Sequence, residues 1–394
     1  MSHQYPLVPL GDVCRFVGGG TPSRKKPEYF AGDIPWATVK DFKHFRIADT
    51  EEHISEIAVA DSATNIVEAG TVLLVSRVGL GKVAIAERKL AINQDIKGLT
   101  PAPHILSEYL FWFLLSRADE IKRMGAGATV KGITLPDIKA IQIPVPPLSE
   151  QRRIVDILSR AEGIVRLRRE AQRKAAELVP GIFLDMFGDP AANPKGWPVE
   201  TIGRLTSVQT GATPSRENPA YYSDAEIPWV KTGEVKGGII SETEEMISQI
   251  ALSETNCKVF PVGTILVAMY GQGQTRGRSA VLGIPAASNQ ACAAILPSSN
   301  IDEAFLFCFL QTQYEQLRGM AHGGNQANLN LSMIKKLPII LPPLSAQKVY
   351  SENLDFVRSI QSQQSAATAK AEAAFAALLA QVFSGNATRQ GLSA

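Results

Sequence analysis

The chain has 394 residues, of which 45% are hydrophobic and 20% charged, and its formal net charge is +2. This length and composition predict a globular protein with two domains, and the small net charge excludes a protein that binds nucleic acid through an overall basic excess. The cysteines at positions 14, 257, 292 and 308 lack CxxC spacing, so we expect buried thiols and neither a disulfide framework nor a zinc site. No apolar run is expected to span a membrane and the N-terminus has no signal-peptide pattern, which predicts a cytoplasmic protein.

A long stretch of the sequence occurs twice. FVGGGTPSRKKPEYFAGDIPW at 16–36 returns as VQTGATPSRENPAYYSDAEIPW at 208–229. In the same order, GTVLLVSR at 70–77 returns as GTILVAMY at 263–270, Asn93-Gln94 as Asn289-Gln290, and VPPLSEQ at 145–151 as LPPLSAQ at 341–347. Because the order is preserved throughout, the sequence indicates a tandem duplication of one domain.

Each copy begins with short apolar runs broken by Gly, Pro and Asp, which predict strands and turns. Residues 71–76 and 82–86 predict a hairpin across VGLG, and 264–270 and 279–282 predict the same hairpin with a longer GQGQTRGR connection. A helix with Tyr109, Leu110, Phe113 and Leu114 on one face follows, and then a glycine-rich loop. Each copy ends in a proline-rich segment through which the chain leaves the domain, which we call the proline-rich exit.

After each exit, apolar residues alternate in steps of three and four, which predicts a coiled-coil helix. The predicted seam of the first helix is Ile154, Ile157, Ala161, Ile164, Arg168, Ala171, Ala175, Leu178 and Ile182. Adding 196 gives the second seam, Tyr350, Asn353, Val357, Ile360, Gln364, Ala367, Ala371, Ala374 and Leu378. We expect the two helices to pair antiparallel, with Arg168 and Gln364 forming a buried polar pair that fixes the register of this spacer.

The fold class is therefore α+β (mixed α/β), with two pseudo-symmetric globular domains separated by a pair of long antiparallel coiled-coil helices. The predicted boundaries are 1–145 for the first domain, 146–187 for the first helix, 188–340 for the second domain, 341–385 for the second helix and 386–394 for a disordered tail.

The sequence contains no recognisable catalytic motif. GLGK at 79–82 lacks the spacing of a phosphate-binding loop, and the glycines at 271 and 273 lack the third glycine of a dinucleotide fingerprint. The five histidines are not spaced for a metal, and none has an equivalent in the other copy. We therefore expect no enzyme active site, no metal and no cofactor in this chain.

Two diverged domains that each open with TPSR...IPW and close with PPLxxQ and a long helix resemble the specificity subunit of a type I restriction-modification system. The resemblance covers essentially the whole chain. It implies that each globular domain is a target recognition domain that reads one half of a bipartite double-stranded DNA target. It also implies that the helices set the spacing of the half-sites and bind two methyltransferase subunits, through which restriction subunits join. S-adenosylmethionine, Mg and ATP, with the DNA adenine methyltransferase and endonuclease activities, would then belong to the partner subunits.

Residues shared by the two copies are candidates for positioning the DNA, because domains with different targets should share phosphate contacts and differ in base contacts. The shared candidates are Thr21, Ser23 and Arg24 with Thr213, Ser215 and Arg216. Thr and Ser here are equally turn formers, and the arginines can bind a phosphate or a carboxylate. Trp36 and Trp229 are assigned to the domain cores.

Residues that differ between the copies are candidates for reading bases, since Arg, Lys, Asn and Gln on loops supply direct readout. The candidates are Ser76, Arg77 and Lys82 in one hairpin loop and Tyr270, Gln272, Gln274, Arg276 and Arg278 in the other, with Lys40, Lys231, Lys131, Asn325 and Gln326 as further DNA contacts. A solvated hairpin tip would have the same composition. The alternative function is a protein-binding scaffold with two homologous heads in a defence complex, without direct base readout.

Overall fold

The computed structural model describes residues 5–125, 132–271, 274–320 and 328–383. The chain divides into two compact units. Unit 1 comprises Met1–Arg169 and Ala366–Ala394, and unit 2 comprises Glu170–Ser365. Each unit thus holds one globular domain, one part of the first long helix and one part of the second.

Unit 1 is built on a five-stranded sheet with the order β2-β10-β7-β8-β4. Its strands are β2 (Cys14–Gly18), β10 (Ile96–Pro101), β7 (Val72–Val75), β8 (Val83–Ala86) and β4 (Arg46–Ile47). Strands β7 and β8 pair antiparallel, which confirms the hairpin predicted across VGLG, whereas the edge strand β4 runs parallel to β8. All residues of β7 and β8 are buried, as expected for runs of consecutive apolar residues covered on both faces.

A second sheet in unit 1 carries the IPW segment. Its order is β5-β3-β9-β6, with β5 (His53–Ile54), β3 (Ile34–Ala37), β9 (Leu90–Ile92) and β6 (Asn65–Val67). The strands β1 (Leu7–Pro9) and β11 (Gln142–Pro144) form a small third sheet. The helices and 3-10 turns of this domain are α1 (Leu10–Val13), η1 (Pro27–Phe30), η2 (Val39–Asp41), α2 (Glu56–Ala60), α3 (Ser107–Ser116), α4 (Ala118–Met124) and α5 (Leu135–Ala140).

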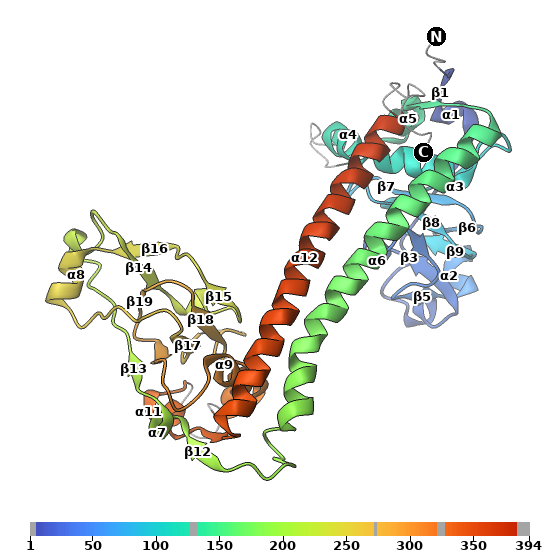
Figure 1. Cartoon of the computed structure of the whole chain (residues 1–394). Helices are drawn as coiled ribbons and strands as arrows, with labels where there is room; N and C mark the ends of the chain where they lie inside the picture. Colours follow the sequence, from blue (N-terminus) through green and yellow to red (C-terminus); the bar gives the residue numbers. More distant parts are fainter. Residues whose placement is uncertain (1–4, 126–131, 272–273, 321–327, 384–394) are drawn as a thin grey trace. The chain divides into compact units, whose positions relative to one another are not determined.

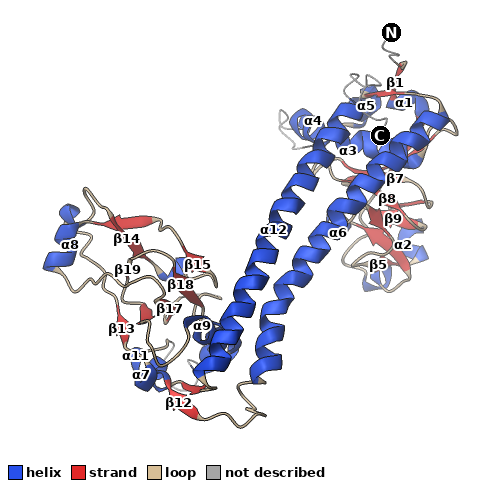
Figure 2. Ribbon diagram, in the orientation of Figure 1, coloured by secondary structure: helices blue, strands red, loops and turns tan. Residues whose placement is uncertain are grey.

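Unit 2 repeats this topology (Figures 1 and 2), except that its second sheet has three strands and, among the described residues, no counterpart of β6. Its main sheet has the order β13-β20-β17-β18-β15, with β13 (Val208–Thr210), β20 (Cys292–Ile295), β17 (Ile265–Ala268), β18 (Ser279–Leu282) and β15 (Ile239–Ile240). The antiparallel pairing of β17 with β18 confirms the second predicted hairpin, and β15 is again parallel to its neighbour. The IPW sheet is β16-β14-β19, with β16 (Glu245–Ile247), β14 (Ile227–Val230) and β19 (Ala287–Ser288), and β12 (Val199–Thr201) pairs with β21 (Pro338–Ile340).

The remaining elements of unit 2 also have counterparts in unit 1. They are α7 (Ile202–Leu205), η4 (Pro219–Tyr221), η5 (Thr232–Glu234), α8 (Gln249–Glu254), α9 (Glu303–Thr312), α10 (Tyr314–Met320) and α11 (Leu331–Lys336). The most apolar helix of each domain, α3 or α9, packs against the main sheet, and Tyr109 and Phe113 or Phe305 and Phe309 lie in its core. The shared topology confirms the duplication predicted from the sequence.

Two helices of 40 residues each follow the proline-rich exits: α6 (Leu148–Phe187) and α12 (Leu344–Phe383). Within unit 1 the start of α6 packs on the end of α12, where Arg169 forms a 2.7 Å ion pair with Glu372. Within unit 2 the end of α6 packs on the start of α12, and the side-chain amide of Gln361 donates a 2.8 Å hydrogen bond to the carbonyl of Ala175. The antiparallel pairing predicted from the seam is therefore confirmed inside each unit.

Half of the predicted seam is displaced by one residue. Ile154 and Ala175 are buried as predicted, but Leu158 and Val165 are buried in place of Ile157 and Ile164. Ile164 is 54% exposed and Leu178 is 46% exposed. In α6 the buried residues therefore follow each other in steps of four and then three. The sequence of this helix cannot distinguish the two patterns, because both members of the pairs Ile157-Leu158 and Ile164-Val165 are apolar. In α12 the same displacement buries Leu354 instead of Asn353 and Thr368 instead of Ala367.

The predicted polar pair of the seam is not buried as a pair. Arg168 is exposed, which corrects the expectation for that residue, and Gln364 is half-buried. Arg168 belongs to unit 1 and Gln364 to unit 2. An arginine side chain is long and always charged, so exposure of the guanidinium avoids the free-energy cost of burying that charge.

In the described part of the chain, α12 alone contains an 18-residue window with a mean hydropathy of 1.2 and few charges, and 17% of this window is buried. This differs from the expectation that no run reaches the length of a membrane span. The two ends of α12 are nevertheless part of domain cores, with Tyr350 and Leu354 in unit 2 and Leu379 and Phe383 in unit 1. Alanines between these ends account for the hydropathy of the helix.

Candidate functional site

The TPSR segment of each domain is anchored to a buried tryptophan. Trp36 on β3 and Trp229 on β14 are both 2% exposed, which confirms their assignment to the cores. The indole N–H of Trp36 donates to the carbonyl of Gly20 at 3.2 Å, and that of Trp229 donates to the carbonyl of Ala212 at 3.1 Å. Each carbonyl belongs to the residue just before the threonine of TPSR, so the start of this segment is fixed in the same way in both units.

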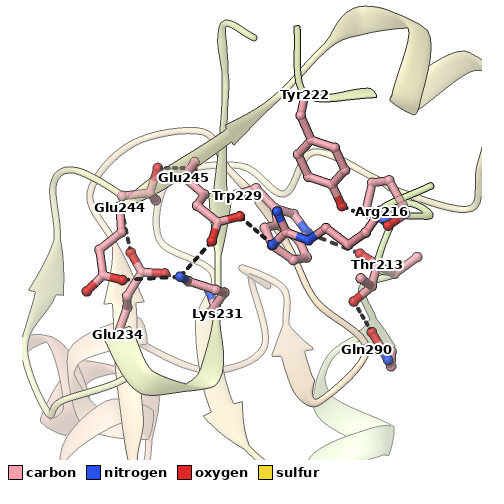
Figure 3. A network of polar contacts seen from close by, with 12 residues as sticks. Thr213, Arg216, Tyr222, Trp229, Lys231, Glu234, Glu244, Glu245 and Gln290 are labelled. Atoms are coloured by element: carbon pink, nitrogen blue, oxygen red, sulfur yellow. Dashed lines mark hydrogen bonds and ion pairs between the residues drawn. The ribbon is translucent and has the colours of Figure 1, made fainter. Parts of the chain in front are cut away.

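The threonine of TPSR provides a second anchor. The hydroxyl of Thr21 donates to the side-chain oxygen of Gln94, and Thr213 donates to Gln290 in the same way (Figure 3 shows the second pair). All four side chains are exposed. Since the hydroxyl occupies the amide oxygen, the amide NH₂ group of each glutamine is oriented as a hydrogen-bond donor at the surface. The Asn-Gln repeat was visible in the sequence, but its contact with TPSR was not.

The arginine of TPSR binds a carboxylate in both units. Arg24 donates two hydrogen bonds to Glu52, at 2.6 and 2.7 Å, and its guanidinium lies 4.4 Å from the ring centroid of Phe30. Arg216 donates to Glu245 at 2.5 Å and lies 4.4 Å from the ring centroid of Tyr222. The hydrogen bond from Arg24 holds the pKa of Glu52 below its usual range. The sequence predicted either a phosphate or a carboxylate as the ligand of these arginines. In the structure both arginines bind a carboxylate.

Unit 2 adds a lysine to this ion pair. Lys231 lies 2.9 Å from Glu245 and 3.2 Å from Glu244, so Glu245 is held by two cations (Figure 3). Hydrogen bonds from Lys231 and then from Arg216 lower the pKa of Glu245. The backbone N–H of Lys231 donates to Glu234, as the N–H of Thr38 donates to Asp41 in unit 1. Thr38, not the exposed Lys40, is therefore the counterpart of Lys231.

Two glycines that sequence reasoning missed allow TPSR to lie against its own sheet. A Cβ atom on Gly19 would come within 2.1 Å of the carbonyl oxygen of Asn93, and one on Gly211 within 1.9 Å of that of Ser288. No side chain fits at such distances, so glycine is required at both positions. The glycine two residues before the threonine of TPSR in both copies was the available signal.

The serines of TPSR occupy turns at the surface. The hydroxyl oxygen of Ser23 accepts from the backbone N–H of Lys25 at 3.4 Å, and that of Ser215 accepts from Glu217 at 3.3 Å. This is the turn-forming role that the sequence left open. Both hydroxyls are exposed and retain a donor.

The hairpin loop of unit 1 differs from expectation at its first residue. Ser76 is 1% exposed and its hydroxyl donates to the carbonyl of Asp95 at 3.1 Å, so this side chain, predicted to contact DNA, is buried and bonded within its own domain. The end of β7 is buried on both faces, and Ser76 continues it. Arg77 lies 3.6 Å from the carboxylate of Asp95 with half of its side chain exposed, and Lys82 is exposed.

The hairpin loop of unit 2 is held by contacts of its own. Arg278 donates to the side-chain oxygen of Gln274 at 2.8 Å, and the hydroxyl of Tyr314 on α10 donates to the backbone carbonyl of Gln274 at 2.7 Å. Tyr270 is 40% exposed and Arg276 is half-buried. The candidates Lys131, Gln272, Asn325 and Gln326 lie outside the described residues.

The sequence model of the family described as "Type I restriction modification DNA specificity domain" matches residues 4–176 and 194–369. The chain belongs to this family. The two matched ranges coincide with the two copies of the duplication, so each unit carries one specificity domain. The match confirms the family resemblance drawn from TPSR, IPW and PPLxxQ.

Relatives of this specificity-domain family resemble the chain over most of its length. The MjaIX specificity subunit of a type I restriction enzyme from Methanocaldococcus jannaschii is 29% identical over 362 residues, which covers 85% of this chain and 82% of the relative. A solved structure from a study of complex assembly and conformational transition of the type I R-M system aligns with a TM-score of 0.66 at 19% identity, covering 98% of both chains. The S subunit of a type I system from M. genitalium aligns with a TM-score of 0.51 at 14% identity over 96% of both chains, and both structures support the fold.

In the part of the specificity-domain chain that the structure describes, no group of three or more His, Cys, Asp or Glu residues is arranged to hold a metal ion. The four cysteines are free thiols, three of them buried. Burial raises the pKa of the Cys14 and Cys292 thiols to about 12. These thiols are protonated at neutral pH and therefore poor nucleophiles and metal ligands.

Proposed function

We propose that this chain is the DNA-recognition subunit of a type I restriction-modification complex and that each domain reads one half of a bipartite target. The observation that carries the proposal is the repeated TPSR site: a loop anchored in both units by a tryptophan, a threonine-glutamine pair and an arginine-glutamate pair. A site shared by two domains cannot discriminate their different sequences, but it can hold each domain on the phosphate backbone.

The available donors that the two copies of this site share are neutral. Arg24, Arg216 and Lys231 are paired with carboxylates, whereas Gln94 and Gln290 present amide groups and Ser23 and Ser215 present hydroxyls. Amides and hydroxyls on loops are common phosphate ligands in protein–DNA complexes. We therefore assign phosphate positioning to the glutamines and serines and structural support to the cations.

Base reading is assigned to the hairpin loops, where the copies differ. Arg77 and Lys82 in unit 1 and Tyr270, Gln274, Arg276 and Arg278 in unit 2 supply side chains suited to base edges. The Gln274–Arg278 hydrogen bond keeps two of these side chains in one arrangement, which reduces the entropy lost on binding.

Catalysis is assigned to partners. We propose that α6 and α12 bind two methyltransferase subunits, that restriction subunits join through these, and that S-adenosylmethionine, Mg and ATP are bound by the partners and not by this chain. The net charge of +2 is low for a protein that binds DNA by itself, so partner subunits would supply much of the phosphate contact.

The test is base-resolution methylation mapping in a host with and without the gene, together with its partner subunits. The proposal predicts a bipartite methylated motif that depends on the gene. Exchange of residues 188–340 for those of a relative with a different target should then change one half of the motif only. A motif that changes in both halves would contradict independent domains, and DNA binding by the complex that is absent or insensitive to salt would favour the protein-binding scaffold.

A further inference from the structure

The first turn of each long helix contains a glutamine whose side chain is completely buried. Gln151 on α6 and Gln347 on α12 are the last residues of the two PPLxxQ segments, and both are 0% exposed. Buried uncharged polar side chains need hydrogen-bond partners, so their contacts show what they hold in place. In both units one partner is the N-cap residue of the core helix, α3 or α9, and another is a backbone carbonyl of the proline-rich exit.

In unit 1, Gln151 connects three segments of the chain. Its side-chain oxygen accepts from the backbone N–H of Leu106, the N-cap residue of α3, at 2.9 Å. Its side-chain amide donates to the carbonyls of His104 and Pro146, both at 2.9 Å. Gln151 thus ties the first turn of α6 to the start of α3 and to the proline-rich exit.

In unit 2, Gln347 repeats two of these three bonds. Its oxygen accepts from the N–H of Asp302, the N-cap residue of α9, at 2.9 Å, and its amide donates to the carbonyl of Pro342 at 2.8 Å. Ser351, one turn further along α12, also donates to the carboxylate of Asp302. The same connection therefore recurs in a domain whose sequence has diverged.

In each unit the end of the other long helix also packs against the core helix. In unit 1 the ring of Phe383, at the end of α12, lies 5.5 Å from that of Tyr109 and 5.6 Å from that of Phe113, both on α3. In unit 2 the ring of Phe187, at the end of α6, lies 4.8 Å from that of Phe305 on α9. Packing by aromatic rings is compatible with small rotations, whereas the directional hydrogen bonds of the glutamine restrict them.

We call the contact between the first turn of a long helix and its domain the joint. The angle at this joint must be accurate, because a small tilt at one end of a long helix displaces its other end by several ångströms. A helix of 40 residues is about 60 Å long at ~1.5 Å per residue, so a tilt of about 3° at one end moves the other end by about 3.4 Å, the rise of one base pair. Fixing the gap between two half-sites to one base pair therefore requires the angle at each joint to be held within a few degrees.

We propose that Gln151 and Gln347 are positioning residues that fix the angle at which α6 and α12 leave their domains, and that they thereby determine the gap between half-sites that the protein accepts. This inference rests on the proposed function. The glutamines touch no candidate DNA contact, so their effect should fall on the gap and not on the sequence of either half-site.

The test uses the full chain co-expressed with its partner subunits and a plasmid library of the mapped target with gaps of the native length and of one base pair more and less. We expect Gln151→Leu with Gln347→Leu to reduce the preference for the native gap by about tenfold or more, because misplaced groups lose a large part of their binding advantage. The half-site sequences should be unchanged. Gln249→Leu, at an exposed position of α8 and outside the long helices, is the matched control and should retain the native preference.

Circular dichroism and thermal unfolding establish whether the variants are folded. If the double leucine variant is not folded, the single variants Gln151→Met and Gln347→Met, which keep the side-chain volume, are measured instead. Folded variants that methylate only the native gap would overturn the inference, as would variants with altered half-site sequences. A wild-type complex that yields no bipartite motif would instead refute the proposed function, so the two failures are distinguishable.

Discussion

The guanidinium of Arg24 donates two hydrogen bonds to the carboxylate of Glu52, a residue 28 positions away in the sequence. The same pairing recurs between Arg216 and Glu245, 29 positions apart. A neutralised arginine stacked on an aromatic ring stabilises the TPSR loop but adds no net positive charge toward DNA. The ion pair therefore predicts how loss of the TPSR arginine affects the salt dependence of DNA binding.

Replacement of the whole ion pair, Arg24→Gln with Glu52→Gln, leaves the net charge unchanged. We expect the slope of log K against log salt for DNA binding by the complex to stay the same, because no phosphate contact is lost. A phosphate-bound arginine would reduce the slope by about 0.9. The exposed neighbour Lys25, changed to Gln, is the comparison for loss of an unpaired charge.

Gln290→Ala removes a surface donor that Thr213 holds in place. If the amide binds a phosphate, affinity for the target should fall about tenfold, since a hydrogen bond to a charged group contributes roughly 1.5–3 kcal/mol. Fluorescence anisotropy with target and scrambled duplexes should show the same loss for both. Gln249→Ala, also exposed in unit 2, is the control, and a loss confined to the target sequence would show that Gln290 reads a base instead.

Gly211→Ala places a Cβ atom 1.9 Å from the carbonyl oxygen of Ser288. The TPSR loop must then move away from its sheet, and we expect the free energy of unfolding to fall by at least about 1–3 kcal/mol. Gly233→Ala is the matched control, because no atom lies within 4 Å of the added Cβ. Urea denaturation of the two variants measures the difference, and equal stabilities would contradict the close approach.

The observed seam of the long helices is tested by two leucines on α6. Leu158 is 0% exposed and Leu167 is 59% exposed. Leu158→Ala should destabilise the isolated protein by about 2–5 kcal/mol, whereas Leu167→Ala should change its stability by no more than about 0.5 kcal/mol. Thermal or urea unfolding of the two variants measures the difference, and equal losses of stability would contradict the observed seam.

The ion pairs of Glu245 predict a dependence of stability on pH. Lys231 and Arg216 lower its pKa in the folded protein below the usual value of 4.5, so the stabilisation is present above that value and is lost as the pH falls through the lower, folded pKa. Wild type should therefore exceed Glu245→Gln in stability at pH 7, and the difference should shrink in acid. Urea unfolding from pH 7 down to acid measures this, with the exposed Glu226→Gln as control, and a constant difference would contradict the ion pairs.

The sequence by itself determined the duplication, the two hairpins, the apolar core helices, the two long helices and the family. These features depend on local periodicity and on the order of motifs along the chain, both of which are written in consecutive residues. Trp36 and Trp229 could be assigned to the core because large aromatic side chains beside apolar strands are seldom exposed.

Only the tertiary structure decided which residues meet. Glu52 and Glu245 were not visible as partners of the TPSR arginines, since the contact forms between strands and loops that are distant in sequence. Ser76 is buried because it continues a covered strand, and the seam follows Leu158 and not Ile157 because the facing helix, not the hydrophobic pattern, selects between two adjacent apolar side chains. The PPLxxQ glutamines were likewise recognisable as part of a motif. Their proposed positioning role, however, depends on hydrogen bonds to the start of a core helix, which only the folded chain forms.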